Sequence, residues 1–177
     1  MNADRSFRLV QRGVVISMLA AVLLTAVAFA PVGRYWVPLN SLATGQRLLI
    51  AAKTDLFVVL WLAIAISNVA RLRFISPIDI AGSGAGPGSQ EIQIAAAFLQ
   101  NTPEQVCIAV PAHLALATLY GGSLALVPVP GGLFCFGRLI FWIGFRRGPV
   151  GRAFGFALTF YPSVGALLLS VFLLLRK

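Results

Sequence analysis

Charged side chains are scarce in this chain and are unevenly distributed. Only 11% of its 177 residues are charged and 59% are hydrophobic, whereas soluble domains have about 25% charged and about 45–50% apolar residues. Long uncharged stretches lie between Arg12 and Arg34, between Glu104 and Arg138, and between Arg152 and Arg176. A composition of this kind excludes an ordinary soluble domain.

Cysteine and histidine are also nearly absent, with two cysteines and one histidine in the whole chain. Cys107, Cys135 and His113 have no zinc-type spacing, and two cysteines in apolar segments imply no disulfide framework. We therefore expect no metal site. We also expect both cysteines to be buried as small hydrophobic residues.

The uncharged stretches have the length of membrane spans. A bilayer core of about 30 Å needs roughly 20 apolar residues per helix, so the first and last stretches each accommodate one span. The middle stretch is interrupted by V-P-V-P-G-G at residues 127–132 and serves two spans. Residues 56–70 span if Lys53 and Arg71 extend their side chains outward. These patterns predict five helices, over about residues 13–30, 47–74, 91–120, 133–145 (or from nearer Ser123) and 151–175.

The first helix follows a basic start, as the core of a cleaved signal peptide does. Its uncharged run over residues 13–33 exceeds the roughly 7–15 residues of a signal-peptide core, although Ala28–Ala30 could serve as a cleavage site. We expect the helix to be retained as a membrane anchor. It belongs to an N-terminal segment, residues 1–46, that precedes a four-helix membrane domain over residues 47–177.

The net charge of +9 does not indicate a nucleic-acid partner, because the basic residues lie at the ends of apolar spans and not on one soluble surface. A cytoplasmic N-terminus places nine basic residues on the cytoplasmic side and five on the other side, as the positive-inside rule favours. The nine are Arg5, Arg8, Arg12, Arg71, Arg73, Arg138, Arg146, Arg147 and Arg152. We expect an integral multi-pass membrane protein, of the bacterial inner membrane, with its N-terminus in the cytoplasm.

Polar residues gather at N-T-P-E-Q, residues 101–105, between two apolar runs. In one interpretation, Thr102 caps a helix that begins at Pro103, and Gln105 completes a capping box. In the other, the helix begins near Glu91 and continues through Pro103 at the loss of one backbone hydrogen bond. The preceding run E-I-Q-I-A-A-A-F-L-Q contains good helix formers and no breaker, which favours the continuous helix.

In a continuous helix, Asn101 and Glu104 share one face, which we expect to face the bundle. A carboxylate inside a membrane is costly and is usually functional or paired. Its candidate partners are Arg71, Arg138 and Arg152. A structural ion pair and a ligand site are both compatible with this pattern.

A second cluster lies near the C-terminal hairpin. Arg138, Phe141 and Phe145 recur at spacings of three and four, and Arg152 opens the next helix. An arginine beside the free N–H groups of a helix N-terminus forms an anion site. The alternative is a group of positive-inside arginines with aromatic lipid anchors.

These residues resemble the MAPEG family (membrane-associated proteins in eicosanoid and glutathione metabolism). The family includes microsomal glutathione transferases, leukotriene-C synthase and the five-lipoxygenase-activating protein. The resemblance covers about residues 47–175 and rests on three elements. A-R-L-R-F-I-S-P is similar to the family's basic helix end before Ser-Pro, and N-T-P-E-Q matches its Asn-x-x-Glu signature. Arg138, Phe141, Phe145 and Arg152 reproduce the spacing of an Arg, Tyr, Tyr, Arg set in glutathione-conjugating members.

The resemblance implies an all-α fold, an integral membrane four-helix bundle with one additional N-terminal transmembrane helix. It also implies a homotrimer in the lipid bilayer, with glutathione held between subunits near the cytoplasmic side. Arg152 is the catalytic candidate, because a cation beside a thiol favours the thiolate. The glutathione-binding candidates are Arg71, Asn101, Glu104, Arg138, Phe141 and Phe145.

The sequence departs from the family pattern at three positions. Ala97 stands where the family commonly has an arginine, and Phe141 and Phe145 lack the tyrosine hydroxyl. Each lost charge-assisted hydrogen bond is worth about 1.5–3 kcal/mol, so capture of glutathione should be weaker. The resemblance still implies that the protein uses glutathione or a similar anionic thiol as co-substrate, to conjugate lipophilic electrophiles or to reduce lipid peroxides. The alternatives are a non-catalytic lipid-binding or scaffold member and an unrelated small transporter with Glu104 as its coupling carboxylate.

Overall fold

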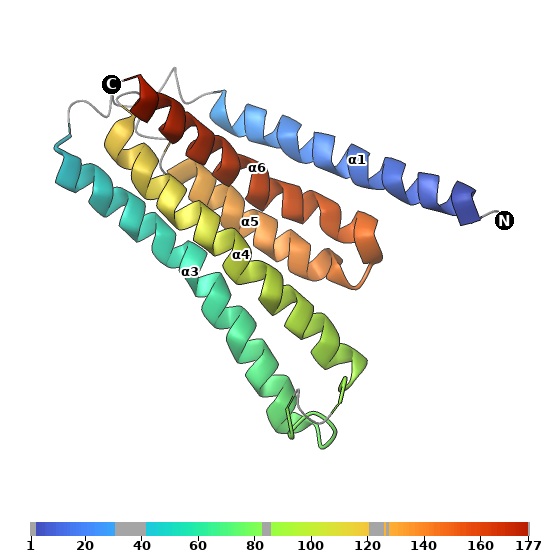
Figure 1. Ribbon diagram of the computed structural model, residues 1–177. Helices are drawn as coiled ribbons and strands as arrows, with labels where there is room; N and C mark the ends of the chain where they lie inside the picture. Colours follow the sequence, from blue (N-terminus) through green and yellow to red (C-terminus); the bar gives the residue numbers. More distant parts are fainter. Residues whose placement is uncertain (1–2, 31–41, 83–85, 121–125, 127, 177) are drawn as a thin grey trace.

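Five long helices make up the part of the chain that the computed structural model describes, which is residues 3–30, 42–82, 86–120, 126 and 128–176. The helices are α1 (Ala3–Phe29), α3 (Thr44–Ile75), α4 (Gln90–Leu119), α5 (Pro128–Phe145) and α6 (Gly148–Leu175). α3, α4, α5 and α6 pack together as a bundle, and α1 lies outside it along α6 (Figure 1). The predicted all-α class, with one helix added before a four-helix bundle, is confirmed.

Length and composition allow four of the described helices to cross a membrane: Ser6–Phe29 of α1, together with α3, α5 and α6. α4 has 30 residues and is long enough, but its polar side chains are spread along its length and leave no apolar stretch as long as those of the other four helices. It packs against both α3 and α6 inside the bundle. The protein is therefore an integral membrane protein, and α4, the bundle helix without a long apolar stretch, is also one of the most enclosed.

α4 is a single helix that continues through two prolines, Pro103 and Pro111. The hydroxyl of Ser89 caps it by accepting a hydrogen bond from the N–H of Ile92, at 3.2 Å. Thr102 caps nothing, because its hydroxyl donates to the carbonyl of Phe98 one turn earlier, at 2.7 Å. The continuous helix predicted from the sequence is confirmed, and the alternative that begins at Pro103 is wrong.

Two helix starts differ from the prediction by five residues or more. α1 begins near Ala3, so its first turns carry the basic residues that were expected to precede it. α5 begins at Pro128, so the segment expected to interrupt the chain is helical from Pro128 to Gly132. Proline is tolerated in a first turn because its missing N–H has no helical partner there. The alternative start near Ser123 lies outside the described residues.

α5 and α6 form a hairpin in which the two backbones nearly touch. A Cβ atom added to Gly137 would lie 2.9 Å from the carbonyl oxygen of Gly155, and one added to Gly155 would overlap the backbone of Phe141. Closer to the turn, Gly144 and Gly151 face each other in the same way. Small residues at helix contacts allow this close approach in membrane proteins. The contact places Arg138, Phe141 and Phe145 of α5 beside the first turns of α6.

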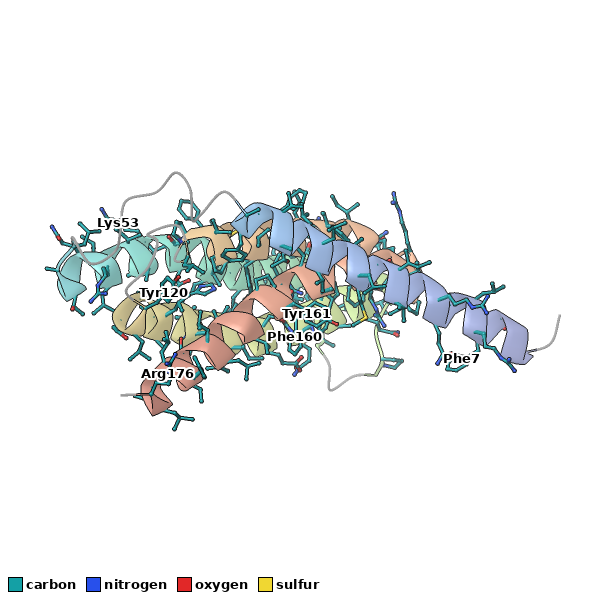
Figure 2. All side chains as sticks on the ribbon, turned by 90° about the horizontal axis from the view of Figure 1, so that it is seen from above. Phe7, Lys53, Tyr120, Phe160, Tyr161 and Arg176 are labelled. Carbon is teal, nitrogen blue, oxygen red and sulfur yellow. The ribbon has the colours of Figure 1, made fainter. Side chains whose placement is uncertain are left out.

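The outer helix α1 packs on α6 through a face of small residues at spacings of four. Ala21 is fully buried, and a Cβ atom on Gly13 would lie 2.9 Å from the side chain of Val150. Ala21 belongs to one apolar cluster with Ala157 and Leu158 of α6. Figures 1 and 2 show the two helices side by side, and Phe7 marks the free N-terminal end of α1.

The connection between α3 and α4 is held by one carboxylate. Asp79 accepts hydrogen bonds from the N–H and the hydroxyl of Ser89, both at 2.7 Å. These bonds, with Ser76 and Arg73 nearby, lower the pKa of Asp79 because they stabilise its charged form. Gly88, directly before Ser89, has φ +68°, and a Cβ atom on it would lie 2.8 Å from an oxygen of the Asp79 carboxylate.

Candidate functional site

Arg138 is the most deeply buried charged residue of the described chain, with a relative exposure of 0%. Its Nη2 donates to the side-chain oxygen of Asn101 at 2.8 Å, and its Nη1 donates to the hydroxyl of Thr102 at 3.3 Å. The guanidinium also lies over the rings of Phe141 and Phe98, 4.4 and 5.5 Å from their centroids. Such contacts offset part of the cost of burying a cation. Arg138 therefore joins α5 to α4 inside the bundle.

A cavity of about 490 Å³ lies next to this cluster. Four helices line it: Val14 and Met18 from α1, Ala97 and Asn101 from α4, Phe141 and Phe145 from α5, and Pro149, Arg152, Ala153 and Phe156 from α6. The volume is within the range of small-molecule sites, about 300–1,000 Å³. The sequence-predicted residues Asn101, Phe141, Phe145 and Arg152 are thus brought together around one space.

Arg152 is the one cationic side chain among the described residues that line this cavity. It is exposed, and its guanidinium lies over the ring of Phe145 at 4.9 Å. α6 begins at Gly148 and not at Gly151, so Arg152 lies about one turn inside the helix instead of opening it. The helix start still lies beside the cavity, because Pro149 lines the same space.

The rings of Phe141 and Phe145 form the aromatic wall between the buried and the exposed arginine. Their centroids are 5.1 Å apart at an interplanar angle of 89°, an edge-to-face arrangement. The ring of Phe141 also lies beside that of Phe156, another lining residue, with 6.3 Å between the ring centroids. Because neither phenylalanine carries a hydroxyl, this wall offers a ligand apolar and π contacts only.

Glu104 does not face the bundle of its own chain, so that prediction is wrong. Its side chain is exposed and accepts hydrogen bonds from Gln100 at 3.2 Å and from Asn101 at 3.4 Å. No arginine among the described residues pairs with it. The face of α4 that does turn inward carries Thr102 and Gln105. Because an α-helix has 3.6 residues per turn, a helix that turns Thr102 and Gln105 inward turns Glu104 outward.

Arg71 is also separate from the cavity. It lies near the C-terminal end of α3, is exposed, and donates a hydrogen bond to Asn68 at 3.3 Å. Of the seven site residues predicted from the sequence, four line the cavity, Arg138 lies behind it, and Arg71 and Glu104 lie outside it. Within one chain, the cavity therefore offers one cation, one amide and an apolar wall.

Comparison with known families agrees with this arrangement. A sequence model of the MAPEG family matches residues 49–172, which include all of α4 and α5, most of α3 and α6, and every bundle residue that lines the cavity. The chain belongs to the MAPEG family. No curated protein and no solved structure gives a match. The first helix of this MAPEG protein lies outside the matched range, as the resemblance indicated.

Two features of this MAPEG protein were missed by sequence reasoning. Val14 and Met18 line the cavity from outside the family-matched range, and only the packing of α1 on α6 reveals this. Asp55 of α3 and His113 of α4 form a buried pair, with 2.6 Å between Oδ1 and Nδ1. A signal for this pair existed, because Asp55 lies in an apolar helix and His113 is the single histidine of the chain.

The two cysteines lie on the bundle helices α4 and α5. Cys107 is exposed on α4, on the same side of the helix as Glu104, and Cys135 is half-buried on α5. The expectation that both are buried is wrong for Cys107. No group of three or more His, Cys, Asp or Glu side chains that could hold a metal ion occurs in the described part of the chain.

Proposed function

We propose that this MAPEG protein binds glutathione or a similar anionic thiol in the cavity and presents it to lipophilic electrophiles or lipid peroxides. The observation that carries the proposal is the position of Arg152, an unpaired cation beside the start of α6 in a cavity lined otherwise by apolar groups and one amide. Both the cation and the helix N-terminus favour an anion. The sulfur of a bound thiol is therefore expected near Arg152.

Arg152 supplies the chemistry of the proposed reaction by holding the thiol in its ionised form. A free thiol has a pKa of about 8.5, which falls beside a cation or a helix N-terminus. In conjugation, the thiol proton leaves to solvent, the sulfur forms a C–S bond with an electrophilic carbon, and the leaving group departs with its electron pair. In peroxide reduction, two thiols become a disulfide while the O–O bond is cleaved to give an alcohol and water.

Arg138 has a different role from glutathione binding, the role expected from the sequence. Because its guanidinium is fully buried and bonded to Asn101 and Thr102, it positions the amide of Asn101 at the cavity wall instead of binding a ligand carboxylate. With Arg71 distant and Ala97 at the wall, one chain provides fewer anchors for the peptide part of glutathione than the sequence suggested.

A second copy of the chain accounts for the missing anchors. Gln93, Gln100 and Glu104 are exposed along one side of α4, and Glu104 lies about 20 Å from the first residue of the helix, near its midpoint. Polar side chains facing lipid at this depth are costly. We propose that a homotrimer covers this side of α4 and that Glu104 then takes part in a site shared between subunits.

The orientation of the chain follows the same reasoning. Three contacts relate the helices at this end of the bundle: Gly13, in the N-terminal half of α1, with Val150; Asp79 with Ser89; and Glu91 with Arg146, the last pair at 3.6 Å. The arginines of residues 5–12, 71–73 and 146–152 therefore lie toward one end of the bundle, with Lys53 and Arg176 toward the other (Figure 2). This supports an orientation with the N-terminus and the cavity on the cytoplasmic side.

The test compares Arg152→Ala with Arg147→Ala, which removes an exposed arginine at the N-cap of the same helix that does not line the cavity. Glutathione binding is measured by titration calorimetry on the purified full chain in detergent, and thiol-dependent turnover is measured against pH. We expect Arg152→Ala to lower activity at pH 7 by more than about tenfold and to shift the profile to higher pH, because the thiol pKa returns toward about 8.5. Arg147→Ala should behave as wild type.

Equal activity of wild type and Arg152→Ala would remove the role of Arg152. Absence of glutathione binding by the wild-type protein would favour the second candidate, a lipid-binding or scaffold member. The observation in favour of that candidate is the wall formed by Phe141 and Phe145, which has no hydroxyl donor. The family match contradicts the third alternative, an unrelated transporter.

A further inference from the structure

The added helix α1 takes part in the cavity although it lies outside the family-matched range. Val14 and Met18 line the same space as Arg152 and Asn101. These two residues are one helical turn apart and are half-buried, whereas their neighbours Val15 and Leu19 are 53% and 62% exposed. The side of α1 that meets the bundle is therefore also the side that closes the cavity.

The position of α1 is determined by contacts on both sides of these two residues. Toward the N-terminus, Gly13 touches Val150 so closely that a Cβ atom would lie 2.9 Å from the valine methyl group. Toward the C-terminus, Ala21 is fully buried in a cluster with Ala157 and Leu158. Val14 and Met18 lie between these anchors, so their side chains are held against the cavity.

The cavity divides into a polar part and an apolar part. Asn101 and Arg152 are its polar residues, and the remaining lining is aliphatic or aromatic. The methionine at the α1 side is unbranched and flexible, and such a side chain adapts to ligands of different shape. A lining of this kind fits a small anion at Arg152 together with an apolar group against α1.

A groove along α1 extends the apolar part. This groove, of about 820 Å³, shares Val14 and Pro149 with the cavity and continues toward Phe7 along the outer helix. Most of its lining is apolar, and Arg8, Gln11 and Arg12 line it as well. An elongated apolar chain that contacts Met18 can therefore extend past Val14 along α1. A compact ligand would leave this groove unused.

We infer that α1 forms the binding wall for the lipophilic co-substrate, with Val14 and Met18 in contact with an elongated, unbranched alkyl chain. The inference rests on the proposed function, which makes the second ligand a lipophilic co-substrate. It assigns the selection of that co-substrate to residues of α1, outside the family-matched bundle. Long-chain carbonyl compounds and lipid hydroperoxides belong to the class of ligand that this wall accommodates.

The experiment uses the full chain in detergent and a methyl dodecanoate that carries a photoreactive diazirine in its alkyl chain. After illumination, labelled positions are mapped by peptide mass spectrometry. We expect Met18 and Phe156, which both line the cavity, to be labelled. Excess unlabelled methyl dodecanoate should abolish this labelling. Labelling of Leu19, which faces outward, should persist. Labelling of Met18 that resists competition, or a mature protein without α1, would overturn the inference.

Two matched variants test the wall further. Met18→Trp fills the part of the cavity beside α1, and we expect at least about tenfold weaker competition by unlabelled methyl dodecanoate at Phe156. Leu19→Trp adds the same side chain on the outward side and should leave labelling of Phe156 unchanged. Equal effects of the two variants would contradict the inference.

Glutathione titration on the same preparations separates this inference from the proposed function. Competable labelling without glutathione binding overturns the proposed thiol chemistry and leaves the α1 wall supported. Glutathione binding without competable labelling overturns the wall and leaves the thiol site supported.

Discussion

At the scale of single residues, the two arginines of the α5–α6 hairpin have opposite environments. Arg138 is enclosed by aromatic rings and bonded to Asn101 and Thr102, whereas Arg152 is exposed at the cavity with one ring beneath it. A buried cation is costly unless it is well bonded. Arg138 therefore holds Asn101 in place inside the bundle, and Arg152 is the arginine that lines the cavity.

Asn101→Ala should destabilise the protein through Arg138. The substitution removes the 2.8 Å acceptor of a buried guanidinium, and a hydrogen bond to a charged group is worth about 1.5–3 kcal/mol. Denaturant unfolding in detergent measures the free energy of unfolding. The control is Gln100→Ala, which removes an exposed side chain bonded to Glu104 and should change that free energy by no more than about 0.5 kcal/mol. Equal effects of the two substitutions would show that Asn101 does not support Arg138.

At the scale of helices, the site depends on how closely α5 and α6 approach each other. Glycines at the contact bring the backbones together, and this brings Phe141 and Phe145 beside the first turns of α6. The outer helix α1 uses the same principle at Gly13 and Ala21. Small residues at helix contacts thus determine both the width of the cavity and its outer wall.

Gly155→Ala should destabilise the hairpin, and Gly165→Ala should not. The added methyl group at Gly155 overlaps the backbone of Phe141, whereas at Gly165 it meets nothing within 4 Å. Overpacking costs about 1–3 kcal/mol, while alanine in place of an exposed helical glycine contributes about 0.5–1 kcal/mol. Thermal unfolding in detergent should therefore show a lower Tm for the first variant and an unchanged or higher Tm for the second. A Tm for Gly155→Ala at or above that of wild type would contradict this prediction. It would mean that α5 and α6 can move apart without loss of stability.

At the scale of the whole molecule, one chain leaves polar surface uncovered within the membrane. Glu104 and Gln100 are exposed on α4, and Cys107 lies on the same side. α4 is also the helix whose composition does not by itself suit a lipid environment. The cost of exposing these side chains to lipid is the physical reason to expect an assembly of several chains.

We expect native mass spectrometry in detergent to give an assembly of three chains of 18.8 kDa. The physical reason is that subunit contact removes Glu104 and its neighbours from lipid. Finding monomers or dimers alone, under conditions in which the protein remains folded, would contradict the trimer. It would also remove the shared site from the proposed function.

Much of the architecture could be predicted from the sequence because charge and apolar length are local properties. Uncharged runs of sufficient length place the membrane helices, and the breaker-free run before Asn101 correctly predicts a continuous α4. The start of α5 was predicted too late, because proline and glycine near residue 130 are compatible with both a turn and a first helical turn. Spacings of three and four correctly grouped Phe141 and Phe145 with Arg138, since all three lie on one helix.

The sequence alone determined that this is an all-α integral membrane protein of the MAPEG type, with an extra helix before the bundle. Only the tertiary structure decided which polar residues face the cavity, because helix period orders the residues around an axis without specifying which side meets which neighbour. It placed Glu104 outside, Arg138 behind the wall and Arg152 at the cavity. It also brought Val14 and Met18 to the cavity, because contacts between helices distant in sequence depend on the packing of side chains across their surfaces.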